Sequence, residues 1–472
     1  MKRKYFALLL AVTVVLGGCS LKKTDSQPDD LPEDTTSEEP QEEPEFLELT
    51  DEDFTKVDLN LNISEDPPPV EIHRADLGDL DFGQRMSPCK EPEYRDATIQ
   101  AFIQPNIDFM NEHDNGMSEE DIESWRNELY ARCEMPSYGD TYGYTTDGEK
   151  LYCIKNFDDI CGEHDTVVFS VDLDTSEIKE LCAHEDPVEP DRMGTLYCVR
   201  DKLIYISLEP SGEQNQNGWN TYIGRLMAID TETGQTSELC SGDFEMIYSV
   251  SGSKIILNKN DYHGDGDSAD YTFSEYDIDT GQLTELYSGT YAIQNEGLDV
   301  FFEISGGKLY RFEMDYANNT TTIISDNYKV TVDMCKNVSF RGATKDKIMI
   351  VNEEYSTYMT SDRKLYTYDL NTRECLVSSF NGYGRTIEQV GDALLAIPQN
   401  SSTYKSPFYY IMPQIGTAFQ VEDMSYNTYC NISGDTAFII EEGDTYTYYE
   451  YGRVERDPGS TKLYWFDISE ER

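Results

Sequence analysis

The sequence has few basic residues and few histidines, and both shortages exclude classes of partner. Its 472 residues contain 37 Lys and Arg against 91 Asp and Glu, which gives a formal net charge of −54. Nucleic acid, teichoic acid and anionic lipid headgroups would all be repelled by such a chain. The five histidines are scattered and none accompanies a Cys-x-x-Cys pair, so the sequence predicts no zinc site.

Familiar catalytic and nucleotide-binding motifs are missing as well. The chain has no Gly-x-Ser-x-Gly nucleophile elbow, no Gly-x-Gly-x-x-Gly turn and no P-loop. It also lacks the Ser-x-Asp-x-Gly-x-Thr-Trp box of sialidase propellers. With 91 acidic residues, two neighbouring carboxylates would say little about acid–base catalysis. These absences favour a non-enzymatic protein, and no catalytic residue is predicted.

Long apolar runs are missing except near the start of the chain. Three basic residues at positions 2–4 precede an apolar stretch from Phe6 to Leu16, which is too short to span a bilayer comfortably and is typical of a secretory signal. The following Gly-Gly-Cys19, read with Leu16, resembles the bacterial lipobox. The resemblance implies a signal peptide over residues 1–18, diacylglycerol on the Cys19 thiol, and an extracytoplasmic protein that is lipid-anchored to the bacterial cell membrane.

The stretch after Cys19 has little apolar material. Residues 21–66 hold 17 acidic side chains against three lysines, and we predict a disordered acidic linker over residues 19–69. Residues 70–140 form an N-terminal segment with one helix. Ser118 is its expected N-cap, and Ile122, Trp125 and Leu129 fall on one face of that helix, which we expect to pack on the next domain.

From residue 141 onward a hairpin pattern repeats. Between Arg225 and Cys240, an apolar run ends at Asp230, whose carboxylate can cap the turn, and Gly234 supplies the positive φ that the loop requires. Copies recur with a mean step of about 49 residues. The aligned positions are 172, 230, 277, 313, 369, 412 and 467. The copies predict an all-β fold, a seven-bladed β-propeller over residues 141–472, with six or eight blades as alternatives.

The repeated aspartates 172, 230, 277, 369 and 467 are interpreted as turn residues because they share one place in the repeat. The last copy stops at Asp467, so the last blade lacks an outer strand. We expect part of residues 70–110 to supply it and close the ring, for instance Pro69–Ile72 or Ala97–Phe102.

Ten cysteines besides Cys19 permit disulfides in an exported chain. Cys182 and Cys240 hold equivalent places in neighbouring copies, and we interpret them as buried thiols on equivalent strands. If any bridge forms, the expected pair is Cys89 with Cys133.

Two loops contain candidate ligand residues. Asp261, Asp265, Asp267 and Asp270 alternate with glycines in a way that could wrap calcium, although the loop departs from the EF-hand pattern and an ordinary polar loop is the simpler interpretation. No other cofactor is predicted. Trp219 stands among amides, a composition that could stack on and hydrogen-bond to a sugar; the simpler interpretation is a long loop between strands whose tryptophan folds back onto the blade. Tyrosines 404, 409 and 410 invite the same interpretation.

The segments Lys364–Thr372 and Arg225–Gly234 resemble the repeat of bacterial lipoproteins that carry a β-propeller domain. Leu463–Asp467 resembles the Tyr-Trp-Thr-Asp signature of lipoprotein-receptor propellers. The resemblance implies a surface binding or scaffolding module and no catalytic residue. We expect the propeller to bind an extracellular protein, peptide or glycan on one face. The alternatives are a carbohydrate-active enzyme with its site at the central funnel, and a pure assembly or sensing partner.

Overall fold

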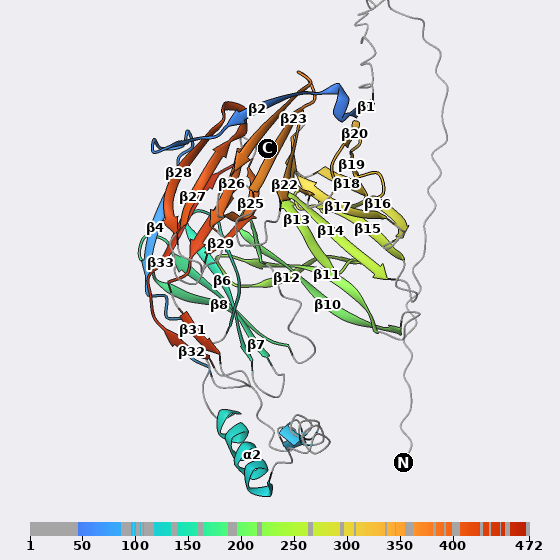
Figure 1. Cartoon of the computed structure of the whole chain (residues 1–472). Coiled ribbons are helices and arrows are strands. Elements are labelled where there is room, and N and C mark those ends of the chain that lie inside the picture. The colour runs from blue at the N-terminus through green and yellow to red at the C-terminus, as the bar shows by residue number, and fades with distance from the viewer. Residues whose placement is uncertain are drawn as a thin grey trace, which may run out of the picture. The chain divides into compact units, whose positions relative to one another are not determined.

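The structure, a computed structural model, is built almost entirely from β-strands. It describes residues 46–85, 96–97, 99–100, 104, 107, 118–133, 140–158, 164–186, 196–214, 220–262, 268–292, 297–305, 308–335, 338–344, 346–354, 362–380, 384–390, 393–398, 406–424, 428–433, 436–443, 445–448 and 454–468. Seven sheets of four or five strands are arranged in a ring (Figure 1). The chain therefore folds as a seven-bladed β-propeller, which confirms the prediction from the repeat.

The first three blades are four-stranded meanders in which each strand pairs with the next. Blade 1 contains β5 (Asp140–Thr146), β6 (Lys150–Asp158), β7 (His164–Asp172) and β8 (Ile178–Asp186). Blade 2 contains β9 (Tyr197–Val199), β10 (Lys202–Gln214), β11 (Asn220–Asp230) and β12 (Thr236–Gly242). Blade 3 contains β13 (Met246–Ser251), β14 (Lys254–Tyr262), β15 (Ser268–Asp277) and β16 (Gln282–Ala292).

The next three blades have the same meander. Blade 4 contains β17 (Leu298–Ser305), β18 (Lys308–Asp315), β19 (Thr320–Ile324) and β20 (Tyr328–Val332). Blade 5 contains β21 (Val338–Ala343), β22 (Lys347–Glu354), β23 (Asp362–Asp369) and β24 (Glu374–Phe380). Blade 6 contains β25 (Gly384–Val390), β26 (Ala393–Pro398), β27 (Ser406–Met412) and β28 (Thr417–Met424).

Blade 7 is completed by a strand from the other end of the chain. Its own strands are β29 (Thr428–Ser433), β30 (Thr436–Glu441) and β33 (Thr461–Asp467), with a ribbon of β31 (Thr445–Tyr448) and β32 (Val454–Asp457) inserted between the last two. The outer place is taken by β4 (His73–Gly78), which pairs antiparallel with β33. This confirms that residues 70–110 close the ring. Neither Pro69–Ile72 nor Ala97–Phe102 supplies this strand. β4 begins just after Ile72, and the described Ile99 and Gln100 are helical.

Residues 46–64 form three further strands, so the prediction of a disordered linker is wrong for this stretch. β1 (Leu47–Thr50), β2 (Thr55–Asn60) and β3 (Asn62–Ser64) pair in parallel with β20, β24 and β28, the outermost strands of blades 4, 5 and 6. We call residues 46–64 the belt. Figure 1 shows β2 lying along the outer edge of blade 5. The belt folds because Leu47, Leu49, Leu59 and Leu61 alternate with polar residues, as in a half-buried strand.

Four of the five repeated aspartates hold turns, as predicted, whereas Asp467 ends β33 and is not followed by a turn to a fourth strand, since β4 takes that place. Oδ1 of Asp230 accepts hydrogen bonds from the N–H groups of Glu232 and Thr233 at 3.1 and 2.8 Å. Asp172, Asp277 and Asp369 accept the same pair of bonds at their own turns. The N–H and then the hydroxyl of Thr233 hold the pKa of Asp230 below its usual range. A lowered pKa means that this turn loses stabilisation as the pH falls through it.

Two copies of the repeat differ from the prediction. In blade 4 the turn is opened by Asp315 rather than by position 313, and Asp315 accepts a 3.0 Å hydrogen bond from the N–H of Asn318. This turn joins the second strand to the third, whereas the other aspartate turns join the third to the fourth. In blade 6 the short 3-10 helix η3 (Pro413–Ile415) and Gly416, with φ of 64°, follow Met412 instead of an aspartate turn.

The fourth residue after the turn aspartate adopts a left-handed conformation. Gly234 and Gly281 have φ of 70° and 69°, whereas blade 1 places Ser176 there with φ of 58°. A non-glycine residue in this region costs on the order of 1 kcal/mol. We therefore expect Ser176→Gly to raise the free energy of unfolding by about 0.5–1 kcal/mol in urea titrations. Asn319→Gly is the control and should change little, because asparagine tolerates this conformation; a loss of stability in Ser176→Gly would contradict the argument.

The predicted helix is present as α2 (Glu119–Cys133). Ser118 is its N-cap: its hydroxyl accepts a hydrogen bond from the Asp121 N–H at 3.1 Å, and its own N–H donates to the Asp121 carboxylate. Ile122 and Trp125 pack with the buried Ile99 and with the half-buried Ile107 and Tyr130. Packing of this helix on the propeller stays a prediction. Within the described ranges, no helix is long and apolar enough to cross a membrane.

Candidate functional site

The two ends of the ring carry different connections between strands. Turns from first to second and from third to fourth strands lie at one end, which we call the turn face. The hydroxyl of Ser305, at one such turn, donates to the carbonyl of Ala343, at the equivalent turn of the next blade, at 2.9 Å. Connections from second to third strands lie at the opposite end, which we call the hairpin face. Loops at one face of a rigid scaffold are the usual place for binding residues.

Blades 1 to 3 have long hairpins at the hairpin face. β10 and β11 pair from Lys202 and Asp230 out to Gln214 and Asn220. β14 and β15 run from Lys254 to Tyr262 and back, and β6 and β7 are nine residues each. The described ends of these strand pairs therefore lie at one face in three consecutive blades, and the residues that connect them, 159–163, 215–219 and 263–267, lie outside the described residues.

The two predicted ligand loops are the tips of adjacent hairpins. Trp219 belongs to the blade 2 tip, and Asp265 and Asp267 belong to the blade 3 tip; all three lie outside the described residues. Asp261 and Asp270 are directly opposite each other on β14 and β15, and the Asp270 carboxylate accepts a hydrogen bond from the Thr290 hydroxyl. Two carboxylates in that position repel each other. In the described part of the chain, no group of three metal-ligating side chains comes together, and calcium binding stays a prediction.

The remaining candidate residues are Cys19 and the tyrosines 404, 409 and 410. Cys19 and Tyr404 lie outside the described residues. Tyr410 is 2% exposed and its ring lies 6.2 Å from that of Phe466. It is a core residue, so the suggestion that it contacts a ligand is wrong: it alternates with half-buried Tyr409 along β27, and this places it between blades 6 and 7.

The cysteines are packing residues where the structure describes them. Cys182 and Cys240 occupy equivalent places on β8 and β12, opposite Val168 and Leu226, as predicted, although both are half-buried rather than buried. Burial raises the pKa of each thiol to about 11, which keeps both protonated at neutral pH. Cys89 lies outside the described residues, so its pairing with Cys133 stays a prediction.

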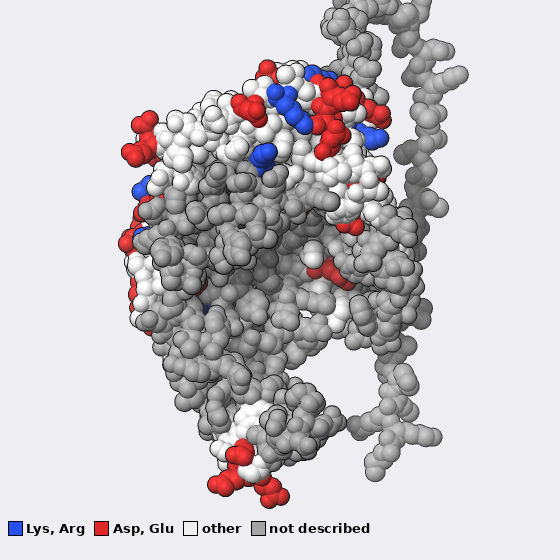
Figure 2. Space-filling model, in the orientation of Figure 1, with Lys and Arg blue, Asp and Glu red and all other residues white. Residues whose placement is uncertain are grey.

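First strands of the blades surround the ring axis. β29 of blade 7 contacts β5, β9 and β13 of blades 1 to 3, so strands from opposite sides meet near the axis. Within the described ranges, the first strands carry four acidic residues: Asp140 of β5, Asp299 and Glu303 of β17, and Glu388 of β25. Asp299 and Glu303 are four residues apart on one strand, which places them about 13 Å apart, beyond the roughly 5–9.5 Å of paired glycosidase carboxylates. On the face drawn in Figure 2, the charged side chains of the described residues are mostly acidic.

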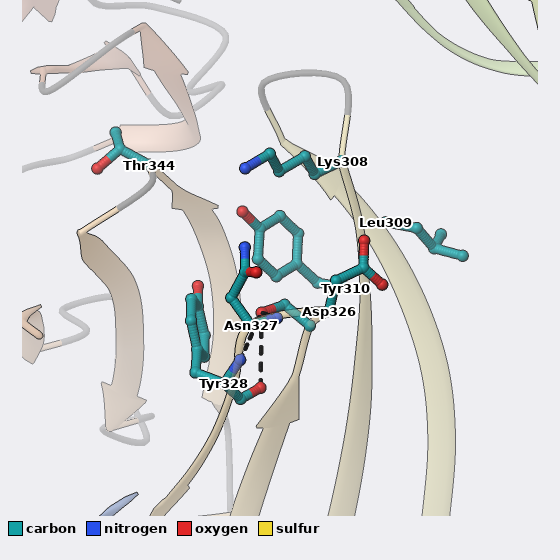
Figure 3. Close-up of a pocket in the computed structure, with 8 residues that line it drawn as sticks. Lys308, Leu309, Tyr310, Asp326, Asn327, Tyr328 and Thr344 are labelled. Atoms are coloured by element: carbon teal, nitrogen blue, oxygen red, sulfur yellow. Dashed lines mark hydrogen bonds between the residues drawn. The ribbon is translucent and has the colours of Figure 1, made fainter. Parts of the chain in front are cut away.

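A small pocket lies between blades 4 and 5 at the turn face, with about 260 Å³ of open space that includes its mouth. Figure 3 shows Lys308, Tyr310, Asn327 and Tyr328 with their polar ends toward the same space, and Leu309 turned away from it. The residues that line it are Lys308, Leu309, Tyr310, Ser325, Asp326, Asn327, Tyr328 and Thr344. Sequence reasoning missed this pocket, since its residues come from three separate turns.

Two buried tyrosine hydroxyls are among the hydrogen-bonding groups of this pocket. Tyr328 is 3% exposed, and its hydroxyl has no hydrogen-bond partner among the described residues. Burial raises the pKa of Tyr310 and of Tyr328, so both remain protonated and cannot act as bases near neutral pH. The closed part of the pocket admits only a small group, such as a water molecule or one polar substituent.

Comparisons with known proteins give likenesses of fold at low identity. No protein-family model matches the chain, and no curated protein matches it. Among solved structures, the β-propeller domain of the Trilobed protease from Pyrococcus furiosus is similar at 10% identity over 64% of this chain and 89% of that chain, with a TM-score of 0.38. The polysaccharide lyase Uly1 is similar at 9% identity over 69% and 89%, with a TM-score of 0.42. The acylaminoacyl peptidase of Pyrococcus horikoshii is similar at 8% identity over 67% of this chain and 52% of that chain, with a TM-score of 0.42.

Proposed function

We propose that this protein is a lipid-anchored, extracytoplasmic binding module that recognises an extracellular protein, peptide or glycan with the hairpin face of its propeller. The observation that carries the proposal is the set of long strand pairs in blades 1 to 3, whose described ends share one face. Two of the segments that connect these ends contain the residues best suited to contact a ligand, Trp219 and the acidic loop that follows Asp261.

The position at which the belt meets the propeller supports the use of the hairpin face for binding. The N–H of Leu47 donates to the carbonyl of Asn327 at 3.0 Å, at the third-to-fourth turn of blade 4. That turn belongs to the turn face, so the chain enters the propeller at the end opposite to the long hairpins. A propeller attached through its belt would keep the hairpin face free for a partner.

The N-terminal sequence supports attachment to a membrane. Residues 1–18 have the features of a lipoprotein signal, and the acidic residues after Cys19 would repel an anionic membrane surface and extend the linker. The anchor is tested by growing cells with labelled palmitate. We expect label on the wild-type protein and none on Cys19→Ser, with release of that variant into the medium; equal labelling of both proteins would contradict lipid attachment at Cys19.

Binding is tested with variants in which single hairpin tips are replaced by Gly-Ser linkers of equal length. A glycan array and a phage-displayed peptide library are the probes. We expect replacement of residues 215–219 or 263–267 to abolish the strongest hits of the wild-type protein. Replacement of residues 355–361, the same connection in blade 5, is the matched control and should preserve them. Hits that survive both blade 2 and blade 3 replacements would contradict the proposal.

A further inference from the structure

The outer edge of blade 3 is an uncovered apolar edge. β16 pairs with β15 along its whole length, and in the described part of the chain no strand pairs with its other side. Leu283 and Leu286 on β16 are 39% and 42% exposed. A long edge strand with exposed leucines offers unpaired backbone groups and apolar surface together, which is the combination that adds another strand.

Equivalent leucines in the two preceding blades are covered. Leu181, Leu239 and Leu286 each stand at a β-bulge of the fourth strand. Leu181 and Leu239 are half-buried and pack against the hydrophobic clusters that they share with the next blade. Leu181 is covered by the aspartate turn of blade 2, since a Cβ added to Gly234 would lie 2.1 Å from the Leu181 carbonyl oxygen.

Blade 4 cannot cover Leu286 in this way. Its aspartate turn, at Asp315, connects the second strand to the third and so lies at the hairpin face. The turn that remains beside blade 3 at the turn face, residues 325–327, belongs to the short pair β19 and β20. The irregular fourth copy of the repeat therefore leaves no aspartate turn of blade 4 at the turn face beside the leucine of blade 3.

The belt shows how this propeller accepts an added strand. β1, β2 and β3 each add in parallel to a fourth strand. Each begins with an N–H that donates to the carbonyl of the residue just before that strand: Leu47 to Asn327, Thr55 to Arg373 and Asn62 to Gly416, at 3.0, 2.8 and 2.8 Å. Leu49 of β1 is 8% exposed, while the alternate residues Glu48 and Thr50 face solvent. A strand that adds to a fourth strand of this propeller therefore runs parallel to it and has apolar residues at every second position.

We propose that β16 is a docking edge for an extended segment of a partner protein, with apolar residues at alternate positions and basic residues between them. The apolar residues would cover Leu286, which stands at the bulge beside Tyr287 on the face toward blade 4, whereas Leu283 lies on the other face, near Gly242 of blade 2. The basic residues match the charge of this edge, where Glu285 is exposed and Asp261 and Asp270 lie near the far end of the same sheet. This surface is separate from the hairpin tips of the proposed function.

Charge argues against two other occupants of the β16 edge, the acidic segment of residues 20–45 and a second copy of the chain. Residues 20–45 are rich in acidic side chains and have no alternating apolar pattern. A second copy of the chain carries the same net charge of −54, so pairing of two β16 edges would bring like charges together. A strand of alternating basic and apolar residues is not repelled by this acidic edge, and it has the alternating pattern that residues 20–45 lack.

The test uses the mature protein and a labelled ten-residue peptide with leucine or valine at alternate positions and lysine or threonine between them. Fluorescence anisotropy should detect binding to the wild type. The double variant Leu283→Ser with Leu286→Ser should bind roughly tenfold more weakly, because the peptide no longer covers an exposed leucine at position 286. Ile223→Ser, which changes an equally exposed apolar residue of blade 2, should bind like the wild type.

Backbone pairing has its own readout. A peptide N-methylated at alternate residues cannot donate to the edge and should lose binding, whichever side chains it carries. Equal binding by the double variant, or full binding of the N-methylated peptide, would overturn the proposal. It would also be overturned if the wild type were a dimer that the double variant converts to a monomer, since a second copy would then occupy the edge. Loss of the hairpin tips should leave peptide binding unchanged, which separates this test from that of the proposed function.

Discussion

Leu77→Ala is expected to lower the free energy of unfolding by about 2–4 kcal/mol. Leu77 lies on β4, the strand that completes blade 7, and is only 2% exposed. It packs in one cluster with Tyr144 of blade 1 and Phe438 and Leu463 of blade 7. Truncation would leave a cavity at the junction where the first and last blades meet. Urea unfolding followed by tryptophan fluorescence measures the loss.

Val57→Ala is the matched control for that variant. Val57 lies on β2 of the belt and is 37% exposed, so its loss should stay within about 0.5 kcal/mol. Hydrogen exchange gives a second readout: Leu77→Ala should speed exchange in β4 and β33 more than in blades 2 and 3. Equal losses for Leu77→Ala and Val57→Ala would show that β4 does not hold the ring closed.

Ring closure could be predicted because it follows from counting strands. Each copy of the repeat needs four strands, and the last copy ends at Asp467 with one missing, so an earlier segment had to supply it. The choice of segment could not be made from the pattern alone. His73–Gly78 reads His-Arg-Ala-Asp-Leu-Gly, and only Ala75 and Leu77 mark its buried face, which is a weaker signal than the apolar runs elsewhere.

The belt shows how composition can hide periodicity. Seventeen acidic residues among positions 21–66 favour a disordered linker, yet Leu47, Leu49, Leu59 and Leu61 alternate with polar residues in the second half of that range. Strand addition needs only one apolar face, so the outward face can be as acidic as a linker. Taken by themselves, residues 46–64 show the alternation of apolar and polar residues that predicts strands.

The candidate site was harder to predict than the fold. The turn aspartates were assigned correctly because they recur, and their recurrence shows a structural role. Trp219 and the acidic loop occur once each, and nothing periodic constrains what a loop binds. The pocket beside Tyr328 and the exposed Leu286 both depend on how blade 4 departs from the repeat, and an alignment that assumes regular copies cannot reveal such departures.

Asp51→Ala is the second variant with a large expected effect, because Asp51 fastens the belt to blade 5. Its side chain is 8% exposed. The hydroxyl of Tyr368 donates to Oδ1 of Asp51 at 3.1 Å, and Nζ of Lys56 donates to Oδ2 at 2.5 Å. The ring of Phe54 packs edge-on against that of Tyr368, with centroids 5.0 Å apart. Alanine would leave the buried Tyr368 hydroxyl unsatisfied, at a cost of about 1–3 kcal/mol.

A double-mutant cycle separates this hydrogen bond from other effects of the substitution. Tyr368→Phe removes the donor, so adding it to Asp51→Ala should cost less than the sum of the two single losses, with a coupling of about 1 kcal/mol. Asp51→Asn keeps an acceptor for Tyr368 and should lose less stability than Asp51→Ala. Limited proteolysis should cut Asp51→Ala within residues 46–64 before the blades are attacked. Strictly additive losses, or proteolysis that begins in the blades, would mean that Asp51 does not hold the belt in place.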